Sequence, residues 1–212
     1  MPRVSRAQAE THREAITDVS ARLFKEHGLK AVSVADLMGA AGLTHGGFYG
    51  HFESKDALAG VAIRHAFEQS VERWRKRMAA LPDAAARRAA LVGAYFTPHS
   101  VRHAGIGCPT VALAGDVARE PADAPIRAAY VDGLEGLVEI LASTQQTGSA
   151  AADRQAALAD YATMVGALLL ARATSGTPTS DAILAAARER LLPEPSATPA
   201  APRKSVKKKQ GA

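Results

Sequence analysis

The chain has 212 residues, a formal net charge of +5 and a single cysteine, and 47% of its residues are hydrophobic although only 5% are aromatic. Alanine dominates the apolar residues, which favours helices because alanine loses no side-chain entropy there. One cysteine excludes an internal disulfide framework, the polar N-terminus does not have the pattern of a secretion signal, and no apolar run approaches the ~18 residues of a membrane span. We therefore expect an all-α protein of the cytoplasm, with no membrane partner and no cofactor.

A long helix followed by a short one is predicted at the N-terminus. Apolar residues recur at helical spacing over residues 5–27, and Gly28 is typical of a helix end. Ser33 can cap the second helix, and Asp36, three residues later, completes a capping box. Gly42 suits the left-handed turn that ends this short helix.

A third helix is predicted over residues 44–51, with Thr44 at its cap. Together with the second helix it has the dimensions of a helix-turn-helix, whose second element lies in the major groove of DNA. Gly46, Gly47 and Gly50 weaken it, because each glycine costs about 0.5–1 kcal/mol relative to alanine. The glycines permit a close approach to the DNA backbone. The alternative is a glycine-rich loop without a binding role.

Helices are predicted for most of the remaining chain. They cover residues 55–80, 84–96, 108–120, 123–147, 151–175 and 180–192, and a loop is predicted over 97–107. Beyond residue 192 the chain is rich in Pro, Ala, Ser and Lys and has five basic residues against one Glu, so most of the net charge lies there. Such a tail is typically disordered and solubilising, and sequence-blind attraction to DNA is the alternative.

The N-terminal sixty residues closely resemble the signature of TetR-family repressors. The resemblance is carried by Ala31–Leu37 and Gly42–Leu58: a capped helix, a tight turn, a Thr cap, an aromatic pair, His-Phe and then Ser-Lys-Asp-Ala-Leu. It implies an N-terminal three-helix DNA-binding domain and a C-terminal helical domain that binds a small effector and dimerises. We expect these domains over residues 1–52 and 53–192, with a disordered basic tail over 193–212.

The same resemblance implies contacts with the DNA backbone. Ser33 and Thr44 lie at helix N-termini, where hydroxyls and backbone amides can hold phosphates. Tyr49 and His51 match family positions that touch the DNA backbone, and Lys55 matches the family's phosphate-binding lysine.

Base recognition is expected from the front of the third helix. His45 and Gly46 occupy this place and are the candidates for contacts with base edges. A solvated surface histidine is the alternative for His45. Arg3, Arg6 and Arg13 are further candidates for DNA contacts, or else a solvated helix start.

A two-fold dimer is expected, because one helix-turn-helix covers only a few base pairs and a near-palindromic operator needs two. The last two helices are the predicted pairing surface. Their apolar and small residues are Ala157, Leu158, Tyr161, Val165, Gly166, Ala167, Leu168, Leu169, Ala171, Ile183, Leu184 and Leu191. The alternative, that they fill the core of one chain, is compatible with pairing for most of them.

Large side chains of the middle helices are candidates to line an effector pocket. They are Trp74, Tyr95, Phe96, Tyr130 and Met164. For each of them, a place in the ordinary core is the alternative.

Cys108 lies in the segment Gly105–Pro109, and the proline predicts that a helix begins beside it. The positive end of a helix dipole favours the reactive thiolate, and His99, Arg102 and His103 add positive charge nearby. The Gly-Cys-Pro element is similar to that of a branch of TetR-like repressors, which implies release of the operator when an electrophile or oxidant acts on Cys108. The alternative is an inert buried cysteine.

Two other functional classes would use the same residues. A thiol-dependent enzyme would take Cys108 as nucleophile and His99 or His103 as base, although no orienting group is evident. A metal-dependent regulator would take the three side chains as ligands, at a loose spacing. We favour regulation over both, and expect neither enzymatic activity nor a bound metal.

Overall fold

The computed structural model describes residues 6–192, and its regular structure is helical throughout this span, which confirms the predicted all-α class. The elements are α1 (Arg6–His27), α2 (Val34–Ala40), the 3₁₀ helix η1 (His45–Gly50), α3 (Lys55–Met78), α4 (Ala84–Tyr95), α5 (Pro98–Arg102), the 3₁₀ helix η2 (Ala104–Ile106), α6 (Pro109–Val117), α7 (Pro125–Ala142), α8 (Ala150–Ala173) and α9 (Pro178–Leu191). The basic tail and the first five residues, including Arg3, lie outside the described residues.

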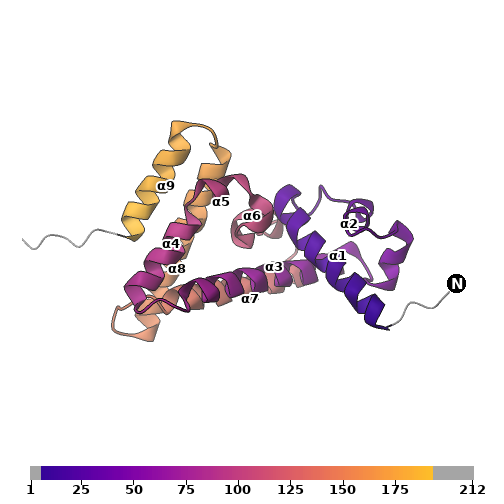
Figure 1. The fold of residues 1–212 in the computed structure, drawn as a ribbon, viewed down its shortest axis with the longest axis horizontal. Helices are drawn as coiled ribbons and strands as arrows, with labels where there is room; N and C mark the ends of the chain where they lie inside the picture. Colours follow the sequence, from indigo (N-terminus) through magenta and orange to yellow (C-terminus); the bar gives the residue numbers. More distant parts are fainter. Residues whose placement is uncertain (1–5, 193–212) are drawn as a thin grey trace, which may run out of the picture.

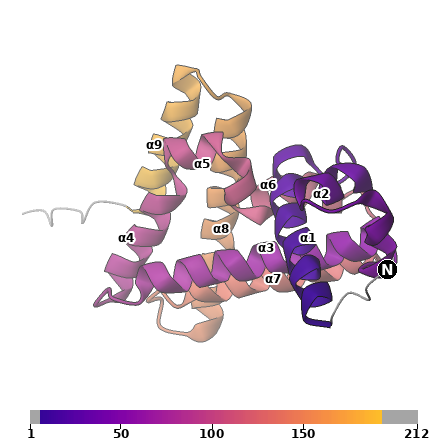
Figure 2. The same cartoon turned by 45° about the vertical axis from the view of Figure 1, so that its right-hand side comes forward.

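The elements separate into a head and a body. Figure 1 shows α1, α2 and η1 gathered at one end; we call these three elements the head, and α3 to α9 the body. The long helices α3 and α7 lie side by side and extend from the head to the far end of the body, where α4, α8 and α9 stand across them. Helices α5 and α6 lie between the two ends, and Figure 2 shows α6 beside the head.

The turns around α2 follow the predicted chemistry. The Ser33 backbone donates to Asp36 Oδ2 over 2.8 Å, and the Asp36 backbone donates to Ser33 Oγ over 3.2 Å, which completes the capping box. Gly28 and Gly42 have φ angles of 85° and 71°, in the left-handed region that glycine adopts without strain. These predictions are confirmed.

The third element of the head is a 3₁₀ helix rather than the predicted α-helix. Thr44 occupies the cap position, but its side chain makes no capping hydrogen bond. Phe48 is fully buried and contacts Phe52 across 6.0 Å between ring centroids. The glycines disfavour a regular α-helix, so packing of Phe48 holds the element in the short, tight form.

Residues 97–107 contain two short helices, so the predicted loop is wrong. Thr97 Oγ1 accepts a hydrogen bond from the Ser100 backbone over 3.1 Å, and Pro98 occupies the first helical position of α5. Proline at this position starts a helix, because the N–H that it lacks would have no partner there.

A glycine allows α7 to lie directly against α3. A Cβ atom at Gly133 would come 2.2 Å from Cγ of Phe67, which is fully buried. The Phe67 ring meets Tyr130 edge-on, with 5.4 Å between centroids. Only glycine leaves room for this ring, so the packing of the body requires Gly133.

Helix α8 exposes a set of large apolar side chains: Leu158, Leu169 and Leu170. Within residues 6–192 it is the one helix long and apolar enough to cross a membrane by length and composition, although only 33% of its most apolar stretch is buried. Large apolar side chains of α8 therefore lie on the surface of the single chain.

Candidate functional site

The outer surface of η1 is exposed and firmly anchored. His45 and Gly46 are exposed, and Tyr49 is 69% exposed although its ring contacts Phe48 edge-on at 5.2 Å. Cβ atoms added at Gly46 or Gly50 would meet no other atom within 4 Å. Neither glycine is therefore required by packing inside the chain.

The next residues secure η1 to the first helix. The Arg13 guanidinium lies over the Phe52 ring, 4.3 Å from its centroid, and donates a hydrogen bond to the His51 carbonyl. Arg13 therefore has a structural role, which the sequence did not predict. Partial burial, and then the nearby charges of His12 and Arg13, lower the pKa of His51, so the ring is neutral at neutral pH.

The other three predicted DNA-binding residues lie at helix starts. Ser33 and Thr44 are exposed, and the Ser33 hydroxyl donates to Asp36 Oδ2 over 2.6 Å. Lys55 is half-buried in the first turn of α3, which Ser54 caps by accepting from the Ala57 backbone. Lys55 also lines a groove between head and body that includes Lys30.

A cavity of about 450 Å³ opens in the body, within the range of small-molecule sites. Its lining residues are Ser70, Arg73, Trp74, Arg77, Leu91, Ala94, Tyr95, His99, Ser100, His103, Ile106, Gly107, Cys108, Leu137 and Leu168. They come from α3, α4, α5, α7, α8 and the η2 segment, so the cavity brings together distant parts of the chain.

Five of the predicted effector residues line this cavity and three do not. Those that line it are Trp74, Tyr95, His99, His103 and Cys108. Phe96 and Met164 are fully buried in the core, and Tyr130 donates to the Thr110 carbonyl over 3.2 Å. Burial raises the pKa of Tyr130 to about 12.

Cys108 is half-buried at the start of α6, directly before Pro109. Its sulfur lies 3.5 Å from the Tyr161 hydroxyl, which is also 2.8 Å from Thr110 Oγ1. The thiol therefore borders the cavity and belongs to a small polar network.

The two histidines near Cys108 pair with one another. The rings of His99 and His103 lie 4.3 Å apart between centroids and are tilted by 36°. Among residues 6–192 no three His, Cys, Asp or Glu side chains form a group that could hold a metal ion, so His99, His103 and Cys108 are not brought together as ligands.

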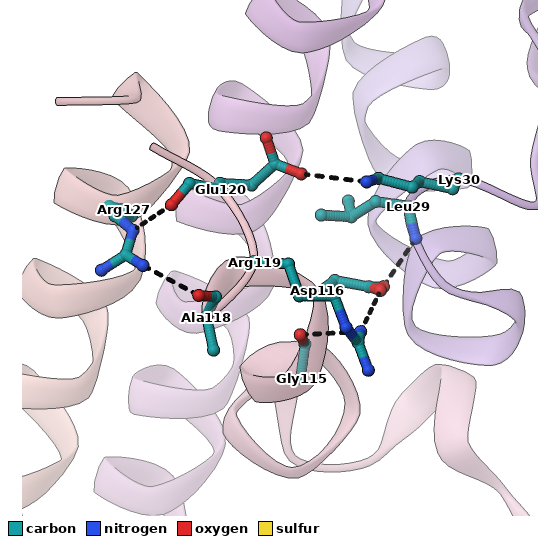
Figure 3. Close-up of polar contacts among 8 residues, drawn as sticks. All are labelled: Leu29, Lys30, Gly115, Asp116, Ala118, Arg119, Glu120 and Arg127. Atoms are coloured by element: carbon teal, nitrogen blue, oxygen red, sulfur yellow. Dashed lines mark hydrogen bonds and ion pairs between the residues drawn. The ribbon is translucent and has the colours of Figure 1, made fainter. Parts of the chain in front are cut away.

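The far end of α6 contacts the head (Figure 3). Asp116 Oδ2 accepts a hydrogen bond from the Leu29 backbone over 2.9 Å, and Glu120 lies 3.9 Å from the Lys30 ammonium. On the other side, Arg127 of α7 donates to the Glu120 and Ala118 carbonyls over 2.8 and 3.0 Å. Helix α6 therefore joins the cavity, at Cys108, to the turn between α1 and α2.

Residues 16–61 match the sequence profile of the family described as bacterial regulatory proteins, tetR family. This segment of the chain therefore resembles the TetR family. Among curated relatives, the HTH-type transcriptional repressor KstR2 of Rhodococcus jostii is 31% identical to this chain over 94 residues. The match covers 44% of this chain and 46% of that protein, so the chain spans about half the length of this relative.

Solved structures extend the TetR likeness to the body. A TetR transcriptional regulator from Chloroflexus aurantiacus is 26% identical, with a TM-score of 0.70 over 88% of this chain and 94% of that one. The reduced form of E. coli NemR is 21% identical, with a TM-score of 0.70 over 84% of this chain and 95% of that one. The curated relative and the Chloroflexus protein are both described as transcriptional regulators, and the fold of the body is the one that these solved structures share.

Three buried or cavity-side cations were not predicted from the sequence. Lys25 of α1 is only 4% exposed, and Arg73 and Arg172 lie near Cys108. Lys25 lies four residues after Ala21 and one after Phe24, both of which are buried. The helical periodicity could therefore have predicted that Lys25 is buried. It could not have predicted the places of Arg73 and Arg172, because their proximity depends on how α3 and α8 pack.

Proposed function

We propose that this chain represses transcription as a homodimer. It binds a near-palindromic double-stranded operator through η1, and a small-molecule effector in the body cavity releases it. The construction of η1 carries this proposal: exposed Tyr49 and two open glycines stand on a fully buried Phe48. Such a surface is held rigidly and can approach a phosphate backbone closely.

The predicted DNA-binding residues in and around η1 fall into two sets with different proposed roles. Tyr49, His51 and Lys55 contact phosphates, with His51 as a neutral hydrogen-bonding group because of its lowered pKa. The helix starts at Ser33 and Thr44 offer further donors to the backbone of DNA. A second, smaller set of residues contacts the edges of the bases.

His45 and Gly46 form that second set. Both are exposed at the start of η1, where the protein leaves room for another molecule. An imidazole can donate to or accept from base edges in the major groove, whereas phosphate contacts carry no sequence information. Substitution of His45 therefore changes which operator is preferred.

Pairing of two chains occurs through α8 and α9. The exposed leucines of α8 support this, because three large apolar side chains on one helix favour a cover that excludes water. Tyr161, Leu168 and Leu184 are buried within one chain and hold α8 in place. A two-fold pair would set the two η1 elements about 34–36 Å apart, one turn of DNA.

The effector acts through α6. This helix begins at the cavity and ends in the Asp116 contact with Leu29, while Arg127 holds its final turn against α7. A ligand that shifts the start of α6 therefore displaces the turn between α1 and α2. The head then leaves the position that suits two consecutive major grooves.

Cys108 is a second route to the same release. Its half-buried sulfur borders the cavity, so a reactive electrophile or an oxidant that enters can reach it. With a maleimide, the sulfur adds to one alkene carbon and the thiol proton ends on the other. The bulky adduct at the start of α6 then displaces this helix.

The head and body are proposed as separate domains, residues 1–52 and 53–192, that act in the cytoplasm on the nucleoid. The boundary falls between η1 and α3, in the segment that contains Phe52 and Ser54.

Selection of bound duplexes from a random DNA pool tests the proposed function. We expect enrichment of sites with two-fold symmetry and half-sites about one helical turn apart. The selection is repeated after treatment with N-ethylmaleimide, for the natural chain and for Cys108→Ser. We expect the reagent to release DNA only from the natural chain. Equal release from both proteins would exclude the thiol route and leave the operator result unaffected.

A further inference from the structure

Two arginines give the mouth of the cavity a positive charge that no lining residue balances. Arg73 and Arg77 line it beside His99 and His103, and none of the lining residues is acidic. In the part of the chain that the structure describes, none of these four side chains forms an ion pair with a carboxylate.

Some arginines of the body pair with carboxylates, but those at the mouth do not. Arg88 lies 2.8 Å from an Asp160 oxygen, and Arg154 lies 2.7 Å from a Glu135 oxygen. Within residues 6–192, by contrast, Arg73 donates to the Ser70 hydroxyl over 2.7 Å and pairs with no carboxylate. Removal from water and the nearby charge of Arg77 lower the pKa of Arg73.

A third arginine lies behind the cavity lining and is held by the backbone. Arg172 of α8 donates to the Ser100 carbonyl over 2.9 and 3.2 Å. A Cβ atom at Gly107, which lines the cavity, would come 2.5 Å from Nη2 of this guanidinium, so a side chain there would displace it. Among residues 6–192 this cation has no carboxylate partner.

One buried polar group of the cavity wall also lacks a partner. Tyr95 is 7% exposed and lines the cavity, and within residues 6–192 its hydroxyl has no hydrogen-bond partner. Lys25 of α1 is 4% exposed, and burial and then the charge of Arg73 lower its pKa to about 8. Burial raises the pKa of Tyr95, so this hydroxyl stays protonated and can donate.

We propose that the cavity binds a small organic anion, a carboxylate with an apolar body. Arg73 and Arg77 hold the charged group at the mouth, and Tyr95 donates to it from inside. The apolar body lies against Trp74 and the leucines of the wall, Leu91, Leu137 and Leu168. This assignment rests on the proposed effector role of the cavity and names the chemical class of the effector.

The single tryptophan of the chain provides a direct assay, because Trp74 lines the cavity. Linear carboxylates from hexanoate to dodecanoate, each with its neutral primary amide, are titrated against the full chain while tryptophan fluorescence is recorded. We expect the best carboxylate to bind at least about tenfold more tightly than its amide, as for one charge-assisted contact.

Substitutions on one helix provide the matched control. Arg73→Gln and Arg77→Gln are expected to reduce the carboxylate preference to less than about threefold, whereas Arg75→Gln, which lies on α3 outside the cavity lining, retains it. Amides that bind as tightly as carboxylates, an equal loss in Arg75→Gln, or no fluorescence change with any probe up to about 1 mM would each overturn the assignment. The assay contains no DNA, so its failure is distinct from a failure to bind the operator.

Discussion

The glycines of η1 and the glycine of α7 occupy opposite environments. At Gly133 the protein itself forbids a side chain, because Phe67 fills the space. At Gly46 and Gly50 the protein leaves the space open, and the backbone would be more stable with alanine. Packing inside the chain therefore explains the glycine of the body. It does not explain the glycines of η1, and we propose that contact with DNA does.

Lys25 is a buried charge, so packing inside the chain does not explain it. Its replacement has the largest expected effect on the free energy of unfolding. The pKa in the folded chain is about 8 against an ordinary value of 10.5. Between pH 8 and pH 10, Lys25 holds its proton more tightly in the unfolded chain than in the folded one, so the free energy of unfolding rises with pH. Below pH 8 the charged lysine destabilises the fold by the full amount. The cost is about 3 kcal/mol, from roughly 1.4 kcal/mol per pKa unit.

We expect Lys25→Met to be more stable than the natural chain at pH 7, and the difference to shrink towards pH 10. Urea unfolding at a series of pH values measures it. The exposed Lys76→Met serves as control, since it should shift stability little and equally at every pH. If the difference in unfolding free energy between Lys25→Met and the natural chain were the same at every pH, the charge of Lys25 would not destabilise the fold.

Gly133→Ala tests whether packing against Phe67 requires a glycine in α7. The added methyl group meets the Phe67 ring, so we expect a loss of about 2–3 kcal/mol in the free energy of unfolding. Gly136→Ala on the same helix is the control, because its Cβ would lie 3.5 Å from Val71 Cγ2, an ordinary contact. It should gain about 0.5–1 kcal/mol from helix propensity. Equal effects of the two changes would contradict the packing argument.

Lys55→Ala tests the phosphate contact proposed at the start of α3. We expect about tenfold weaker binding to every duplex, and a salt slope smaller by about 1, as for the loss of one phosphate contact. Binding is measured at several salt concentrations, with Lys76→Ala at the other end of α3 as control. A change in sequence preference without a change in slope would assign Lys55 to the bases instead.

Local patterns predicted much of the fold. The capping box of Ser33 and Asp36 and the left-handed glycines 28 and 42 depend on residues close in sequence, and they are present as expected. The sequence pattern does not predict α5, because proline commonly interrupts a helix, whereas Pro98 here occupies the first helical position. Predicted helix 123–147 is shorter in the structure, where α7 ends at Ala142.

The sites were predictable only where a motif or a nearby residue marked them. The motif marked Tyr49 in η1 and Lys55 at the start of α3, and Pro109 beside Cys108 marked the start of α6. The cluster of Arg73 and Arg172 around the cavity was not predictable, because α3 and α8 are far apart in sequence and periodicity does not report which helices pack together.

The measurement that tests the central claim most directly is the pair of Gly46→Ala and Gly39→Ala, each assayed for unfolding and for operator affinity. Neither alanine would meet a protein atom within 4 Å. Both variants should be as stable as the natural chain or gain up to about 1 kcal/mol. We expect Gly46→Ala to bind the selected operator about fivefold more weakly, roughly 1 kcal/mol, and Gly39→Ala to bind unchanged. Undiminished binding by a folded Gly46→Ala would contradict the claim that η1 lies against DNA.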